Sequence, residues 1–84
     1  MKNKFYAVKD VVVGSFMQPV AMANDEAAKR SLRLAANDPQ AFKENKEDIQ
    51  LWYLFELDSE TGLVEKNQPY LIGNLIDFIE HKES

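Results

Sequence analysis

The sequence predicts an α+β fold, in which a small, mostly antiparallel sheet of three to four strands packs with one central helix and a C-terminal helix. Two patterns predict this fold. Apolar residues alternate along Asp48–Leu57, as in a strand, whereas Asp25–Ala36 is rich in Ala, Leu, Arg and Lys, as in a helix. The length of 84 residues predicts a single domain that spans residues 1–84.

The N-terminal part of the chain is predicted to be extended. Phe5 to Lys9 is rich in aromatic and β-branched residues, which favours a strand, and the pattern leaves open whether this strand reaches Val13. After a glycine-serine turn, Phe16 to Met22 is predicted to be a second extended segment. Pro19 lacks a backbone N–H, which restricts this segment to a sheet edge or a bulge.

The central helix is predicted from Asp25 to Ala36. Asn24 suits the N-cap, because its side-chain oxygen can accept from free N–H groups of the first turn, and Asn37-Asp38-Pro39 ends the helix. One face is apolar and is expected to pack on the sheet; it comprises Ala28, Leu32, Ala35 and Ala36. The opposite face is basic and comprises Lys29, Arg30 and Arg33.

Asp48–Leu57 is the clearest predicted strand. One face of it is apolar throughout and comprises Ile49, Leu51, Tyr53, Phe55 and Leu57. The other face carries Trp52 and Leu54 in its middle, so that either the strand is central and covered on both sides, or Trp52 and Leu54 face a partner subunit. Asp58–Gly62 has the composition of a short hairpin loop, and Leu63–Lys66 is expected to return as the next strand.

The C-terminal segment carries apolar residues at helical spacing. These residues are Leu71, Ile72, Leu75, Ile76 and Ile79. They predict a helix from about Tyr70 to Lys82, with Gly73 and Asn74 as weak helix formers. The alternative for Tyr70–Ile72 is a short strand.

Composition excludes several kinds of site. The absence of cysteine rules out disulfides, thiolate zinc sites and a cysteine nucleophile, and one histidine cannot supply a metal cluster. No catalytic set is discernible, so we expect neither an enzyme nor a cofactor. The longest uncharged stretch, Val11 to Asn24, is too short to cross a bilayer, and the cysteine-free chain is expected to be cytosolic, without a membrane partner.

Charge is distributed unevenly along the chain. The formal net charge is −4, but residues 1–33 carry six Lys/Arg against three Asp/Glu, whereas residues 34–84 carry four against eleven. An acidic total argues against a uniformly basic nucleic-acid binder, yet the positive part can still offer a basic patch.

Two sets of side chains are candidates for binding. The first could contact phosphates and comprises Lys29, Arg30 and Arg33 with Lys2, Lys4 and Lys9; the alternative is a solvated surface. The second could stack on bases or form an oligomer interface and comprises Tyr6, Trp52 and Leu54. Most aromatic residues of so short a domain are expected in its core, with Tyr6 and Trp52 as exceptions because polar residues neighbour them.

Short motifs follow one another along about three quarters of the chain. They are Phe5–Asp10, Phe16–Val20, Asn24-Asp25 with Ala28 and Arg30, Asn37–Pro39, and Asp48–Asp58 followed by Gly62. In this order they resemble the small nonstructural protein family of gokushovirus-type microviruses, which are bacteriophages with circular single-stranded DNA. The chain departs from the family at Ile49, where the family has tyrosine, at Phe55, where it has glycine, and in the C-terminal stretch.

The resemblance implies a nonenzymatic phage nonstructural protein that binds DNA in replication or packaging of a single-stranded DNA phage, in the host cytoplasm. We expect a homo-oligomer, a dimer or larger, because one basic helix per subunit provides few phosphate contacts and strand edges need covering. The alternative is a protein–protein interaction module that regulates a phage or host factor without binding nucleic acid, for which the acidic C-terminal half and the Trp52 strand argue.

Overall fold

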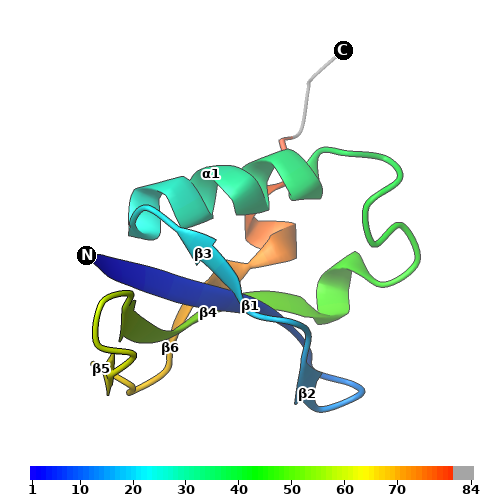
Figure 1. Ribbon diagram of the computed structural model, residues 1–84. Coiled ribbons are helices and arrows are strands. Elements are labelled where there is room, and N and C mark those ends of the chain that lie inside the picture. The colour runs from blue at the N-terminus through cyan, green and yellow to red at the C-terminus, as the bar shows by residue number, and fades with distance from the viewer. Residues whose placement is uncertain (81–84) are drawn as a thin grey trace.

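The computed structural model describes residues 1–80, which form a six-stranded antiparallel sheet with one α-helix on one side of it (Figure 1). The strands are β1 (Lys2–Asp10), β2 (Ser15–Phe16), β3 (Val20–Met22), β4 (Ile49–Asp58), β5 (Val64–Glu65) and β6 (Tyr70–Asn74). The helix is α1 (Asp25–Ala36), and the short 3₁₀ helices are η1 (Lys46–Asp48) and η2 (Leu75–Phe78). The predicted α+β class is confirmed.

Two long strands, β1 and β4, form the centre of the sheet and pair along their whole length. β2 and β3 both pair with the outer edge of β1, while β5 and β6 both pair with the other edge of β4. The sheet therefore has two continuous central strands and two edges that are each divided between short strands.

The prediction of three to four strands was wrong because both edges are divided. The segment Phe16–Met22 does not form one strand: residues 17–19 separate β2 from β3, and Pro19 has no N–H to give to a ladder. On the other edge, the segment after β5 forms β6, whereas the spacing of its apolar residues predicted a helix.

The central helix has its predicted bounds. The Asn24 side chain accepts a hydrogen bond from the Ala27 N–H at 2.8 Å, and Asp25 and Glu26 lie in the first turn, where the helix dipole favours negative charge. At the other end, the Asn37 side chain donates to the Arg33 carbonyl at 2.9 Å. Local signals in the sequence therefore define both ends of α1.

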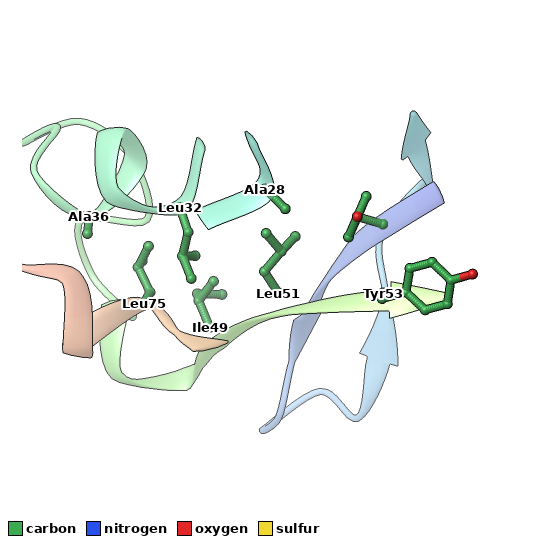
Figure 2. Packing of buried hydrophobic residues seen from close by; sticks show 8 residues of the cluster. Ala28, Leu32, Ala36, Ile49, Leu51, Tyr53 and Leu75 are labelled. Atoms are coloured by element: carbon green, nitrogen blue, oxygen red, sulfur yellow. The ribbon is translucent and has the colours of Figure 1, made fainter. Parts of the chain in front are cut away.

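The core lies between α1 and the sheet (Figure 2). Figure 2 shows Ala28, Leu32 and Ala36 directed from the helix towards residues of β4 and η2. Those residues are Ile49, Leu51 and Leu75, and all are buried. Because two of the three helix residues are alanines, α1 approaches the sheet closely.

A C-terminal helix from Tyr70 was a wrong prediction, and the alternative of a strand at Tyr70–Ile72 is correct. Tyr70–Asn74 forms β6 on the open edge of β4, and η2 follows it for a single turn; residues 81 and 82 of the predicted helix lie outside the described residues. Gly73 fits this arrangement, since a Cβ there would lie 2.7 Å from the Phe78 ring. Pairing with β4 thus outweighs the helical spacing of the apolar residues.

A β-bulge at Leu54 changes which residues of β4 face the helix. Tyr53 pairs with Tyr6 whereas Phe55 pairs with Phe5, so Leu54 is an extra residue between them. The predicted alternation is correct from Ile49 to Tyr53 and wrong beyond it. Phe55 and the residues after it exchange faces, and Glu56 turns to the side of the sheet that α1 covers.

Candidate nucleic-acid interface

The side of the sheet away from α1 is not covered by any helix of residues 1–80 (Figure 1). We call this surface the open face. Strand register and side-chain alternation assign to it Phe5, Ala7, Lys9, Phe16, Gln50, Trp52, Leu54, Phe55, Leu57 and Leu71. Its residues come from β1, β2, β4 and β6, so it extends across most of the sheet.

Aromatic rings on the open face lie in two neighbouring pairs. Phe5 and Phe55 stack with their ring centroids 5.0 Å apart, and Phe16 meets Trp52 edge to face with centroids 6.0 Å apart. The Trp52 Nε1–H donates to the Gln50 side-chain oxygen at 3.0 Å, which holds the indole in its plane. Phe5, Trp52 and Phe55 are partly exposed and Phe16 is 42% exposed, so the rings remain accessible.

One charged side chain lies among these rings. The Lys9 Nζ is 5.2 Å from the centre of the Phe16 ring and 5.6 Å from that of Trp52, within the range of cation–π attraction. The strand register places the carboxylates of the described strands on the helix side of the sheet. They are Asp10, Glu56, Asp58 and Glu65. The strand side chains of the open face are therefore apolar with one cation, and a carboxylate, Asp77, lies at its edge, where it accepts from Asn74 at 3.4 Å.

The basic residues of α1 lie elsewhere. Ala28 and Leu32 are the helix residues that face the sheet. The three basic residues lie on the rest of the helix surface, and the sheet separates them from the open face; they are Lys29, Arg30 and Arg33. The Lys29 Nζ is 3.6 Å from the Glu26 carboxylate. These three side chains therefore do not belong to the open face.

The N-terminal lysines are divided between the two sides of the sheet. Lys2 lies on the helix side, where its Nζ is 2.7 Å from the Glu65 carboxylate, and this hydrogen bond raises the pKa of Lys2. Lys4 also lies on the helix side, opposite Glu56 on β4. Of the six basic candidates, only Lys9 lies on the open face, so the structure does not bring the set together.

Tyr6 was predicted to be available for stacking or for an interface, and this prediction was wrong. Its side chain is fully buried under α1, because it follows Phe5 and therefore points to the opposite side of β1. Its hydroxyl donates to the Asp25 carboxylate at 2.5 Å, and the Tyr70 hydroxyl donates to the other carboxylate oxygen at 2.6 Å. Tyr6 therefore connects the sheet to the first turn of α1.

The two hydrogen bonds to Asp25 change the pKa of this carboxylate and of the two tyrosines that donate to it. Burial raises the pKa of Asp25, but the hydrogen bonds from Tyr6 and Tyr70 outweigh it, so that the pKa lies below its usual value. Burial, followed by the hydrogen bond to Asp25, raises the pKa of Tyr6. The hydrogen bond to Asp25 raises the pKa of Tyr70 to about 12.

A cleft of about 480 Å³ opens on the helix side of the sheet, near the end of β4. Its lining comprises Lys4, Tyr53, Glu56, Lys66, Asn67, Gln68 and Tyr70. Sequence reasoning missed this cleft, because strict alternation placed Glu56 with Trp52 on the opposite side of the strand. The cleft could have been predicted only from a bulge at Leu54, and nothing in the local sequence indicates a bulge there.

The described residues contain no group of three or more His, Cys, Asp or Glu side chains placed to hold a metal ion. No helix in residues 1–80 is long and apolar enough to cross a membrane. What the open face offers chemically is a set of accessible rings beside one cation, which suits planar, π-rich ligands.

These features define the class of the molecule: a small α+β protein with one helix-covered side and one aromatic, open side of an antiparallel sheet. Residues 3–78 match the family described as Phage ORF5 protein, and the chain belongs to this family. No curated protein and no solved structure matches the chain. The family assignment makes it a phage protein and agrees with the phage origin implied by the sequence motifs.

Proposed function

We propose that this phage protein is a nonenzymatic, nonstructural protein that binds single-stranded DNA across its open face. The observation that carries the proposal is the group formed by Phe5, Phe16, Trp52 and Phe55 with Lys9 among them. Bases of a single strand stack on aromatic side chains, at about 1–3 kcal/mol per base, and a nearby cation attracts the backbone. The bases of a duplex are paired and stacked already, so these rings favour single strands.

Charge on the open face supports this choice of ligand. A polyanion would be repelled by carboxylates, and the register places those of the strands on the helix side. Lys9 is held near both Phe16 and Trp52, so a phosphate beside it would lie next to a stacked base.

The basic side of α1 is the competing DNA surface, and the two surfaces predict different salt dependences. For single strands, the logarithm of affinity falls with the logarithm of salt concentration by about 0.7 per phosphate contact. One cation on the open face predicts a slope of about −1, whereas contacts by Lys29, Arg30 and Arg33 predict a slope of about −2. The open face therefore predicts binding that depends on stacking and only weakly on salt.

We further propose the biological setting implied by the sequence resemblance. The protein would act in replication or packaging of a single-stranded DNA phage, as in the microviruses, and in the host cytoplasm. Stacking without base-edge contacts is tolerant of sequence, which suits a protein that must bind genomic DNA at many positions.

A second copy of the chain is the alternative occupant of the open face. Leu54, Leu57 and Leu71 surround the aromatic pairs, and an apolar, weakly charged surface of this kind also suits a homodimer or another phage or host protein. In that arrangement Trp52 would be buried at the centre of the interface. A dimer formed through this surface would compete with DNA for the same residues.

Fluorescence anisotropy of a labelled oligo(dT) strand tests the proposal. Trp52→Ala should weaken binding by about tenfold or more, because a lost stacking contact costs about 1–3 kcal/mol, whereas Trp52→Phe should retain most of the affinity. Leu34→Ala removes an exposed apolar side chain from α1, far from the open face, and serves as the matched control.

Three results would overturn the proposal. They are the absence of binding at about 50 mM salt, a salt slope near −2, and loss of affinity in Arg30→Ala plus Arg33→Ala without loss in Trp52→Ala. Light scattering of the same samples distinguishes the dimer: if Trp52→Ala converts a dimer to a monomer and no DNA binds, the open face is a protein interface.

A further inference from the structure

The cleft on the helix side of the sheet is lined by the carboxylate of Glu56, a residue that is otherwise buried. Glu56 is only 5% exposed, and its nearest cation is the Lys66 Nζ at 3.8 Å, longer than a hydrogen bond. Lys66 itself is largely in solvent. No fully buried side-chain N or O atom of residues 1–80 lacks a partner, so the Glu56 oxygens, which accept no hydrogen bond from these residues, open into the cleft. Because an ionised carboxylate accepts and cannot donate, Glu56 suits a ligand with N–H donors.

The charge of the lining restricts the kind of donor. Lys4 and Lys66 both line the cleft with Glu56, so a cationic ligand would meet two like charges against one opposite charge. A neutral group that carries adjacent N–H donors satisfies the carboxylate without this repulsion. An acceptor beside those donors would in turn bind a lysine.

The wall of the cleft is aromatic and held in place. Tyr70 stacks on Tyr53 with the ring centroids 4.7 Å apart, and its hydroxyl is fixed by Asp25. The Tyr53 hydroxyl donates to the Lys66 carbonyl at 2.9 Å and holds that residue at a positive φ of 46°, which a residue with a Cβ rarely adopts. The site is therefore formed before a ligand arrives, and Tyr70 is exposed enough to stack on a planar ring.

We infer that this cleft binds a guanine base through Glu56, Lys66 and Tyr70. Guanine presents N1–H and the exocyclic N2 amine side by side, which matches the two oxygens of a carboxylate, and its O6 acceptor lies next to them, where a lysine can donate. Adenine presents an acceptor at N1 instead, which would face the Glu56 carboxylate. The volume of about 480 Å³ falls in the range of small-molecule sites and leaves space for a sugar-phosphate near Lys4.

The cleft and the open face lie on opposite sides of the sheet, so the guanine site does not depend on DNA binding by Trp52. The guanine can belong to a free nucleotide or to a DNA strand. Both ligands present the same base to the cleft, so a DNA strand that contains one guanine is compared with the free nucleotide below.

Calorimetric titration of the full chain with dGMP, dIMP and dAMP tests the site. We expect saturable binding of dGMP, about tenfold weaker binding of dIMP, which lacks the N2 amine, and no saturable binding of dAMP. Glu56→Gln keeps the volume of the side chain but replaces one acceptor with a donor, so it should abolish the preference for guanine. Glu44→Gln, which changes an exposed carboxylate that does not line the cleft, is the control and should retain that preference.

Thermal unfolding shows whether Glu56→Gln remains folded. If it does not, Lys66→Met is the second variant, because it leaves Glu56 in place. This variant should weaken the binding of dGMP, because it removes the donor to O6 of the base. Equal affinity for dGMP and dAMP, or a guanine preference unchanged in both variants, would overturn the inference.

An oligo(dT) strand with one central dG separates the two sources of guanine. Tighter binding of this strand than of plain oligo(dT), lost in Glu56→Gln, supports a base within DNA, whereas a preference confined to dGMP supports a free nucleotide. Plain oligo(dT) reports on the open face alone. Failure of either proposal is therefore visible without affecting the other.

Discussion

Phe5 and Phe55 stack on the open side of the sheet, while their neighbours Tyr6 and Tyr53 meet edge to face on the covered side with ring centroids 5.6 Å apart. Both pairs form across β1 and β4, although Phe5 is adjacent to Tyr6 in sequence and Phe55 is separated from Tyr53 by Leu54. The extra residue Leu54 therefore explains why Phe55, two residues after Tyr53, lies on the opposite side of the sheet from it.

Deletion of Leu54 should leave the fold intact. Without this residue Phe55 follows Tyr53 directly, so the pairs with Phe5 and Tyr6 continue as a regular ladder and every side chain keeps its side. Deletion of Gln50 is the control, because it moves Ile49 out of the core. Circular dichroism and thermal unfolding should show a cooperative transition for the first deletion and none for the second; equal loss in both would contradict the bulge assignment.

Leu75 and Ile76 are adjacent, but only Leu75 belongs to the core. Leu75 is fully buried beneath α1, whereas Ile76 is 45% exposed. Leu75→Ala should lower the free energy of unfolding by about 2–5 kcal/mol through the lost contacts and the cavity, while Ile76→Ala should change it by about 0.5 kcal/mol. Denaturant unfolding of both variants measures the difference, and comparable losses would mean that η2 is oriented differently.

Gly73→Ala tests the packing of β6 against η2. The added Cβ would lie 2.7 Å from the Phe78 ring and 3.2 Å from the Leu32 side chain, so we expect a loss of about 1–3 kcal/mol in the free energy of unfolding from overpacking. Phe78→Leu opens space beside this position. The double variant should therefore lose less stability than the sum of the two single changes, and strict additivity would contradict the contact.

The tyrosine network predicts stability that falls at high pH. All three tyrosines have a raised pKa in the folded protein, by burial for Tyr6 and Tyr53 and chiefly by the hydrogen bond to Asp25 for Tyr70, whose pKa is about 12. In the unfolded chain the tyrosine pKa is about 10, which is lower than in the folded protein. The protonated tyrosines therefore stabilise the fold fully below pH 10, and this stabilisation is lost as pH rises towards 12.

Absorbance of tyrosinate in the near ultraviolet measures this shift. The folded protein should show tyrosine ionisation well above pH 10, whereas the urea-unfolded chain should titrate near 10. Tyr70→Phe should remove the titration near pH 12 and raise the pKa of Asp25, which loses one of its two donors. Ionisation of Tyr6 or Tyr70 near pH 10 in the folded state would contradict the network.

Local signals account for the parts of the fold that the sequence could predict. Asn24, the acidic first turn and Asn37-Asp38-Pro39 define α1 without reference to the rest of the chain, and the alternation from Ile49 to Tyr53 identifies the side of β4 that packs on it. The C-terminal segment could not be predicted in this way. Its apolar spacing suits a helix, and only the free edge of β4 and the space beside Gly73 favour a strand.

The candidate sites depend on the same non-local contacts. Trp52 and Leu54 were identified from the sequence because the middle of their strand is apolar on both sides. The positions of Phe5 and Phe55, and the burial of Glu56, could not be predicted, since each follows from the register between β1 and β4 and from the bulge. Tyr6 was misplaced because a polar neighbour, Lys4, does not determine whether a strand residue is covered by a helix.

Trp52 is the only tryptophan of the chain and lies at the centre of the open face, so its own fluorescence tests the central claim most directly. The unlabelled protein is titrated with oligo(dT) at about 50 mM salt, with duplex DNA as the comparison. Stacking of a base on the indole predicts saturable quenching by the single strand and little change with the duplex. Binding of the single strand without any change in Trp52 emission would contradict the account.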